Sequence, residues 1–179
     1  DQTSKTEAPS ELPTAAADKT LRVCVVGAGA ISREFALHHF TPASSSTVVT
    51  SIVDLNATRA ASLAADVGAV QAGALITTVG RKYESTVTKG AAAGRPVPHA
   101  TSLSAVLESC DIVFVGVPPM AHASLVLEAL AAGKHVLLEK PVAATAADAD
   151  AIVTAAEAAA PALHLGLDIG MRWNPGLRE

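Results

Sequence analysis

A lysine beside a glutamate, at the end of an apolar run, is the residue of this sequence best placed to move a proton. Lys140 follows Glu139 directly after Lys134–Leu138, which we expect to form a strand. A lysine held at a strand end could give a proton to a substrate oxygen or accept one from it. The alternative is a surface lysine paired with Glu139, and spacing alone does not separate these two interpretations.

A glycine turn suggests a partner for that chemistry. The apolar run Leu21–Val26 stops at Gly27-Ala28-Gly29, and a helix-compatible segment follows at once. Gly27 permits a tight turn, and Gly29 lacks a side chain, so that backbone N–H groups can approach a pyrophosphate. Ser32 stands at the third position of the G-x-G-x-x-G/A pattern, where it is small enough for helix and strand to pack.

An aspartate after the next apolar run supports a dinucleotide site. Asp54 ends the run Thr47–Val53 and lies about 20 residues beyond the glycine turn, where an acidic residue bonds the adenosine ribose. Arg59 is expected to lie too far along to contact a 2′-phosphate. We therefore expect NAD to be preferred, with NADP as the second choice. The alternative is an ordinary strand–turn–helix unit with a chance aspartate.

Strand–helix alternation supplies the elements that position these residues. We expect parallel strands near Leu21–Val26, Thr47–Val53, Val97–Ala100, Asp111–Val117, Lys134–Leu138 and Ala162–Gly166. Helices are expected over Ile31–Phe40, 56–67, Ser102–Ser109, Ala123–Ala132 and Thr145–Ala160. The fold class is α/β, a doubly wound parallel sheet of the Rossmann type. Ligands of such sheets bind beyond the carboxyl ends of the strands, which Gly27, Asp54, Pro118, Glu139 and Arg172 all follow.

Three further segments differ from this alternation. Residues 1–19 read as a flexible tail before a dinucleotide-binding domain over 20–176. Residues 68–95 are too long for a βα connection and contain two β-prone runs around Gly80-Arg81-Lys82, which favours a hairpin insertion. Residues 177–179 are expected to begin a truncated second domain.

Composition narrows the function classes. The chain has 179 residues, half of them apolar, and a formal net charge of −4, with no basic stripe for nucleic acid. No apolar run approaches the roughly 18 residues of a membrane span. Cys24 and Cys110 have no spacing that supports a disulfide framework or a zinc site, so we expect no metal and reduced thiols in a cytoplasmic protein.

Five motifs together resemble one family. GAGAIS, SIVD, VGVPPMAH, GKHVLLEKP and MRWNP, in this order, are similar to the N-terminal domain of the Gfo/Idh/MocA oxidoreductases over about 21–175. The resemblance implies binding of NAD(H) or NADP(H) and hydride transfer to or from a sugar, cyclitol or related carbonyl or alcohol. It makes Lys140 the catalytic residue and suggests a cis bond before Pro141.

The expected cofactor-binding residues combine the glycine turn with these motifs: Gly27, Gly29, Ala30, Ile31, Asp54, Pro118, Pro119, His122, Glu139, Lys140 and Arg172. His122 is placed to contact the cofactor ribose or amide, although composition alone favours a capping or solvated histidine. The resemblance implies a C-terminal α+β substrate domain, which we expect to be absent from this chain. We therefore expect little turnover by the fragment, which could be a monomer, and a homo-oligomer of the full-length protein.

Two other readings stay open. One is a nucleotide-sensing regulator that resembles the yeast galactose repressor, and the other is a biliverdin-reductase-like dehydrogenase. An intact Lys140 favours an enzyme acting on a small molecule, because a sensor has no need of the proton-transfer group.

Overall fold

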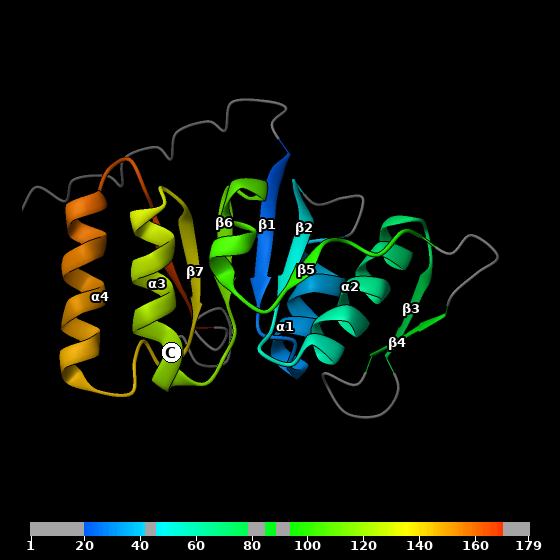
Figure 1. The fold of residues 1–179 in the computed structure, drawn as a ribbon, viewed down its shortest axis with the longest axis horizontal. Helices are drawn as coiled ribbons and strands as arrows, with labels where there is room; N and C mark the ends of the chain where they lie inside the picture. Colours follow the sequence, from blue (N-terminus) through cyan, green and yellow to red (C-terminus); the bar gives the residue numbers. More distant parts are fainter. Residues whose placement is uncertain (1–19, 42–45, 79–84, 89–93, 170–179) are drawn as a thin grey trace, which may run out of the picture.

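Six parallel strands form the central sheet of the computed structural model, which describes residues 20–41, 46–78, 85–88 and 94–169 (Figure 1). Their order is β5-β2-β1-β6-β7-β8, and each neighbouring pair runs parallel. The strands are β1 (Leu21–Val26), β2 (Thr47–Val53), β5 (His99–Ala100), β6 (Ile112–Val115), β7 (His135–Glu139) and β8 (Leu165–Asp168). The doubly wound parallel sheet expected from the sequence is confirmed.

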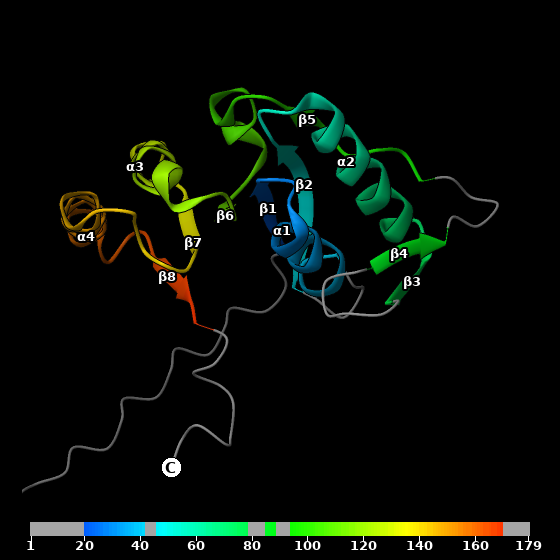
Figure 2. The same ribbon diagram turned by 90° about the horizontal axis from the view of Figure 1, so that it is seen from below.

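Helices cover both faces of the sheet (Figure 2). On one face lie α1 (Ala30–Glu34), the π-helical η1 (Phe35–His39) that continues it, and α2 (Ala57–Gln71). On the other lie α3 (His122–Ala131) and α4 (Ala146–Ala159). The described residues also form three 3₁₀ turns: η2 (Leu103–Ala105), η3 (Leu107–Ser109) and η4 (Pro119–Ala121).

Successive side chains of a strand point to opposite faces of the sheet, so the hydrophobic core has one part on each face. Val23 and Val25 of β1 pack with α1, η1 and α2, whereas Cys24 and Val26 pack with α3 and α4. Phe114 of β6 is fully buried on the α2 side and stacks on Phe35 with 4.6 Å between ring centroids. Burial on both faces explains why these strands are continuous apolar runs.

The second helix is longer than the sequence predicted. The expectation ended it near Val67, before Gly68, but α2 continues to Gln71. Gly68 lies inside the helix because the chain at Arg95 passes close to it: an added Cβ would lie 2.2 Å from the Arg95 carbonyl oxygen. This glycine therefore serves a close tertiary approach and does not end the helix.

The helix predicted over Ser102–Ser109 is wrong. Two 3₁₀ turns, η2 and η3, occupy the segment, and Val106 between them has a non-helical φ of −128°. Leu103 and Val106, three residues apart, are both buried, which suits the three-residue period of a 3₁₀ helix. The last strand, predicted over about Ala162–Gly166 or slightly beyond, is Leu165–Asp168.

An antiparallel pair, β3 (Leu75–Thr78) and β4 (Ser85–Thr88), forms within the long segment that follows α2. These are the two β-prone runs in which a hairpin was expected. The turn between them, the segments 1–19 and 177–179, and Arg172 lie outside the described residues.

Candidate cofactor-binding site

The glycine turn after β1 adopts the geometry its sequence requires. Gly27 has a φ of +94°, and an added Cβ would lie 2.5 Å from the Gly116 carbonyl oxygen, so only glycine fits. Gly29 is the N-cap of α1, and an added Cβ there would meet nothing within 4 Å. The turn thus leaves open space beside Gly29, where backbone N–H groups can donate hydrogen bonds to an anion.

Ser32 fits the position where the fingerprint usually has glycine or alanine. It is fully buried, and its Oγ donates a hydrogen bond to the Gly116 carbonyl oxygen at 3.1 Å. Gly116, just after β6, makes room for it, because a Cβ there would lie 2.3 Å from Ser32 Oγ. The serine therefore joins α1 to the end of β6 directly.

Asp54 holds the loop after β2 in place. Its Oδ2 accepts the Ala28 N–H at 2.8 Å, and its Oδ1 accepts the Asn56 N–H at 2.8 Å. Arg59 Nη2 also donates to Oδ1, at 3.0 Å. Burial by itself would raise the pKa of Asp54, but the two N–H donors and the Arg59 guanidinium lower it below its ordinary value.

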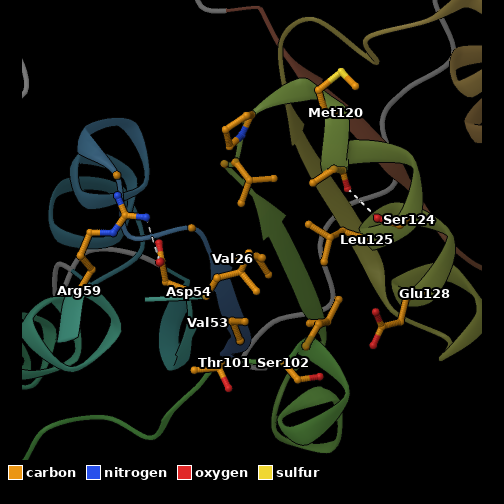
Figure 3. Close-up of a pocket in the computed structure, with 18 residues that line it drawn as sticks. Val26, Val53, Asp54, Arg59, Thr101, Ser102, Met120, Ser124, Leu125 and Glu128 are labelled. Carbon is orange, nitrogen blue, oxygen red and sulfur yellow. Dashed lines mark hydrogen bonds and ion pairs between the residues drawn. The ribbon is translucent and has the colours of Figure 1, made fainter. Parts of the chain in front are cut away.

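Arg59 therefore reaches Asp54 and lines the cavity edge, although the sequence placed it too far along the chain to contact a 2′-phosphate. The Asn56 side chain caps α2 by accepting the Arg59 N–H, which fixes Arg59 in the first helical turn. From there its side chain reaches back over the cap to Asp54 (Figure 3). The residue five positions after the aspartate is thus its ion-pair partner.

A cavity of about 720 Å³ opens beyond the carboxyl ends of β1, β2 and β6. This volume is ordinary for a small-molecule or cofactor pocket. Asp54 and Arg59 form one wall, and Ser124, Leu125 and Glu128 of α3 form the wall across from it (Figure 3). The remaining lining residues are Val26, Gly27, Gly29, Val53, Leu55, Thr101, Ser102, Leu103, Gly116, Val117, Pro118, Met120 and Ala121.

His122, which the sequence placed among the cofactor-binding residues, does not line this cavity. It is fully buried, and its Nε2 lies 2.9 Å from the Val117 carbonyl oxygen. Its Nδ1 lies 2.9 Å from the carbonyl oxygen of Pro141. The imidazole ring instead connects the end of β6 to the loop that follows Lys140.

Lys140 lies at the same edge of the sheet, two strands away from β1. It is exposed, and its backbone N–H donates to Glu139 Oε2 at 3.0 Å. None of the ion pairs found among the described residues joins the Lys140 and Glu139 side chains. The Lys140–Pro141 peptide bond is cis, as the family resemblance suggested.

Glu139 faces Asp168 across the β7–β8 pair. The two residues are register partners, and Glu139 is 7% exposed. Burial raises the pKa of Glu139, and the charge of Asp168 and a hydrogen bond with it raise it further, against the lowering effect of the Lys140 N–H. A proton is therefore held more tightly at this carboxyl pair than at an ordinary glutamate.

The structure brings some of the predicted cofactor-binding residues together and not others. Gly27, Gly29, Asp54 and Pro118 line the cavity. The other described members of the set do not line it: Ala30, Ile31, Pro119, His122, Glu139 and Lys140. Sequence reasoning left Arg59 out of the site and missed the α3 wall. The helical spacing of Ser124 and Glu128, one turn apart, places both on one face of α3.

Comparison with known proteins agrees with this geometry. Residues 21–167 match the model of the Gfo/Idh/MocA oxidoreductases, described as an oxidoreductase family with an NAD-binding Rossmann fold. The chain belongs to this family. Galactose 1-dehydrogenase of Pseudomonas fluorescens is 39% identical over 82 residues, which are 42% of this chain and 27% of that protein.

Solved structures show the same fold. Myo-inositol 2-dehydrogenase of Lactobacillus plantarum superposes with a TM-score of 0.67 at 15% identity, covering 88% of this chain and 38% of that one. The WlbA dehydrogenase of Chromobacterium violaceum, in complex with NADH and UDP-GlcNAcA, gives a TM-score of 0.62 at 22% identity, covering 88% and 37%. The chain thus spans well under half the length of these relatives.

The site fits a dinucleotide such as the family's NAD. The open space beside Gly29 suits a pyrophosphate, and the Asp54 and Arg59 wall suits an adenosine ribose.

No described helix is both long and apolar enough to cross a membrane.

Proposed function

We propose that this chain is the cofactor-binding part of an NAD(P)-dependent dehydrogenase acting on a hydroxyl or carbonyl of a sugar, cyclitol or nucleotide sugar. The bound nicotinamide supplies the hydride acceptor or donor. The observation that carries the proposal is the position of Lys140 at the carboxyl end of β7, at the sheet edge where the cavity opens beyond β1, β2 and β6. The galactose, inositol and UDP-sugar dehydrogenases among its relatives support the substrate class.

Different residues of this chain bind the dinucleotide, transfer the proton and position the proton-transfer group. The glycine turn and the Asp54 loop bind the dinucleotide and fix its adenosine end. Lys140 moves the proton at the substrate oxygen while hydride passes to or from the nicotinamide. Glu139 holds the backbone of Lys140 through the 3.0 Å hydrogen bond, and His122 ties the following residue to the end of β6. These two are positioning residues.

The test is NADH formation from NAD+ by the protein that contains this chain, with galactose, myo-inositol and UDP-sugars as substrates. We expect turnover with one of these classes and a loss of at least about 100-fold in kcat for Lys140→Ala, with NADH binding retained. Lys134→Ala, which removes a lysine at the opposite end of β7, is the matched control. Unchanged kcat in Lys140→Ala would contradict the assigned role, and NADH binding without any turnover would favour the nucleotide-sensing regulator.

A further inference from the structure

The Asp54–Arg59 wall of the cavity presents a guanidinium to a ligand more than it presents a carboxylate. The Arg59 side chain is 61% exposed, whereas that of Asp54 is 6% exposed. Both residues line the cavity. A nucleotide entering this end therefore meets the cation first, and the carboxylate lies behind it.

The Asp54 oxygens already accept hydrogen bonds from within the protein. Oδ2 accepts the Ala28 N–H, and Oδ1 accepts both the Asn56 N–H and Arg59 Nη2. A carboxylate that binds the two ribose hydroxyls needs acceptor sites facing the ligand. Here most of that capacity is used to hold the loop, so the usual basis for NAD preference is weakened.

Arg59 retains the capacity to bind an anion. A guanidinium has five N–H donors arranged to match phosphate, and the contact with Asp54 uses only Nη2. Arg59 also lies in the first turn of α2, a 15-residue helix whose N-terminal end carries partial positive charge. The charged residues that line the cavity are Asp54, Arg59 and Glu128, and Glu128 lies across it on α3 (Figure 3).

We infer that Arg59 makes the adenosine end of this cavity a binding site for a 2′-phosphate, so that the chain binds NADPH at least as tightly as NADH. The Arg59–Asp54 pair cancels the negative charge that would otherwise repel the phosphate. The phosphate of the ligand then either replaces the Asp54 carboxylate as the partner of the Arg59 guanidinium or binds the guanidinium beside it. This inference rests on the proposed function, because it assumes that a nicotinamide dinucleotide occupies the cavity.

The test is fluorescence titration of the 179-residue chain with NADH and NADPH, for the original sequence and for Arg59→Ala. We expect NADPH to bind as tightly as NADH or more tightly. Arg59→Ala should weaken NADPH binding by about 10- to 100-fold, the value of one to two hydrogen bonds to a charged group. NADH binding should change by less than about threefold, because the unphosphorylated ribose takes little from the guanidinium.

A matched control variant and a second pair of ligands separate a specific contact of Arg59 with the 2′-phosphate from a general effect of removing a positive charge. Arg95→Ala removes another exposed arginine, near the far end of α2 at Gly68, and should leave both affinities unchanged. Competition by 2′,5′-ADP should exceed that by 5′-AMP in the original chain and equal it in Arg59→Ala. NADPH binding more than tenfold weaker than NADH, or equal losses of both in Arg59→Ala, would overturn the inference and leave the proposed function standing. Binding of neither dinucleotide by the folded chain would overturn both.

Discussion

Removing the Asp54 carboxylate should destabilise the fold in a pH-dependent way. In Asp54→Ala, the Ala28 and Asn56 N–H groups lose a charged acceptor at 2.8 Å each. Two hydrogen bonds to a charged group contribute about 1.5 kcal/mol each at the lower end, so the variant should lose about 3 kcal/mol near neutral pH. For a domain of this size, this loss corresponds to a fall in Tm of roughly 6 to 12 °C.

The sign of the pH dependence follows from the lowered pKa of Asp54. The folded state favours the ionised carboxylate, so its stabilising contribution is present above the ordinary pKa of 3.8 and is lost as pH falls through the lower folded value. Urea unfolding at about pH 7 and about pH 3 measures this, and the cost of Asp54→Ala should be clearly smaller at the lower pH. Asp150→Ala, an exposed aspartate on α4, is the control for general charge effects. An equal cost at both pH values would refute the role given to the ionised carboxylate.

Two further tests, which use three variants, address the local geometry of the site. Gly27→Ala should lower the free energy of unfolding in urea by about 1 to 3 kcal/mol, because of the φ of +94° and the 2.5 Å approach to the Gly116 carbonyl oxygen. Gly29→Ala should leave stability unchanged, because an added Cβ there meets nothing within 4 Å. Equal effects of the two substitutions would contradict this. Because the raised pKa of Glu139 means that stability falls as pH rises above its ordinary 4.5, Asp168→Asn should raise Tm at about pH 8 and leave it nearly unchanged at about pH 4. A Tm gain that is the same at both pH values would show that charge repulsion is not the cause.

Local sequence signals were sufficient for the framework of the fold. Leu21–Val26 and Thr47–Val53 were predicted with the bounds that the structure has, because each apolar run stops at a glycine or an aspartate that breaks the strand. The cap of α4 was also predictable, because a threonine followed three residues later by an acidic residue is a helix-start pattern. In the structure, the Thr145 side chain accepts the Asp148 N–H. These features depend on neighbours in the chain.

Features that depend on distant contacts were not predictable in the same way. In the sequence, Gly68 suggests that the helix ends there. Only the close approach of the Arg95 backbone shows why a glycine lies inside α2. His122 is polar, yet it is fully buried, with its two ring nitrogens against the Val117 and Pro141 carbonyl oxygens. Arg59 could have been placed by counting from the Asn56 cap, because an N-cap side chain accepts the N–H of the residue three positions later, which puts Arg59 in the first turn.

The central claim is that a nicotinamide dinucleotide binds beyond the carboxyl ends of β1, β2 and β6. The most direct measurement is the change in backbone amide NMR shifts of the 179-residue chain on addition of NADH. The account predicts saturable changes at 27–31, 54–59 and 117–125, with α4 (146–159) unaffected. Saturable changes centred on α4 or on the β3–β4 pair, or no changes in a folded chain, would contradict it.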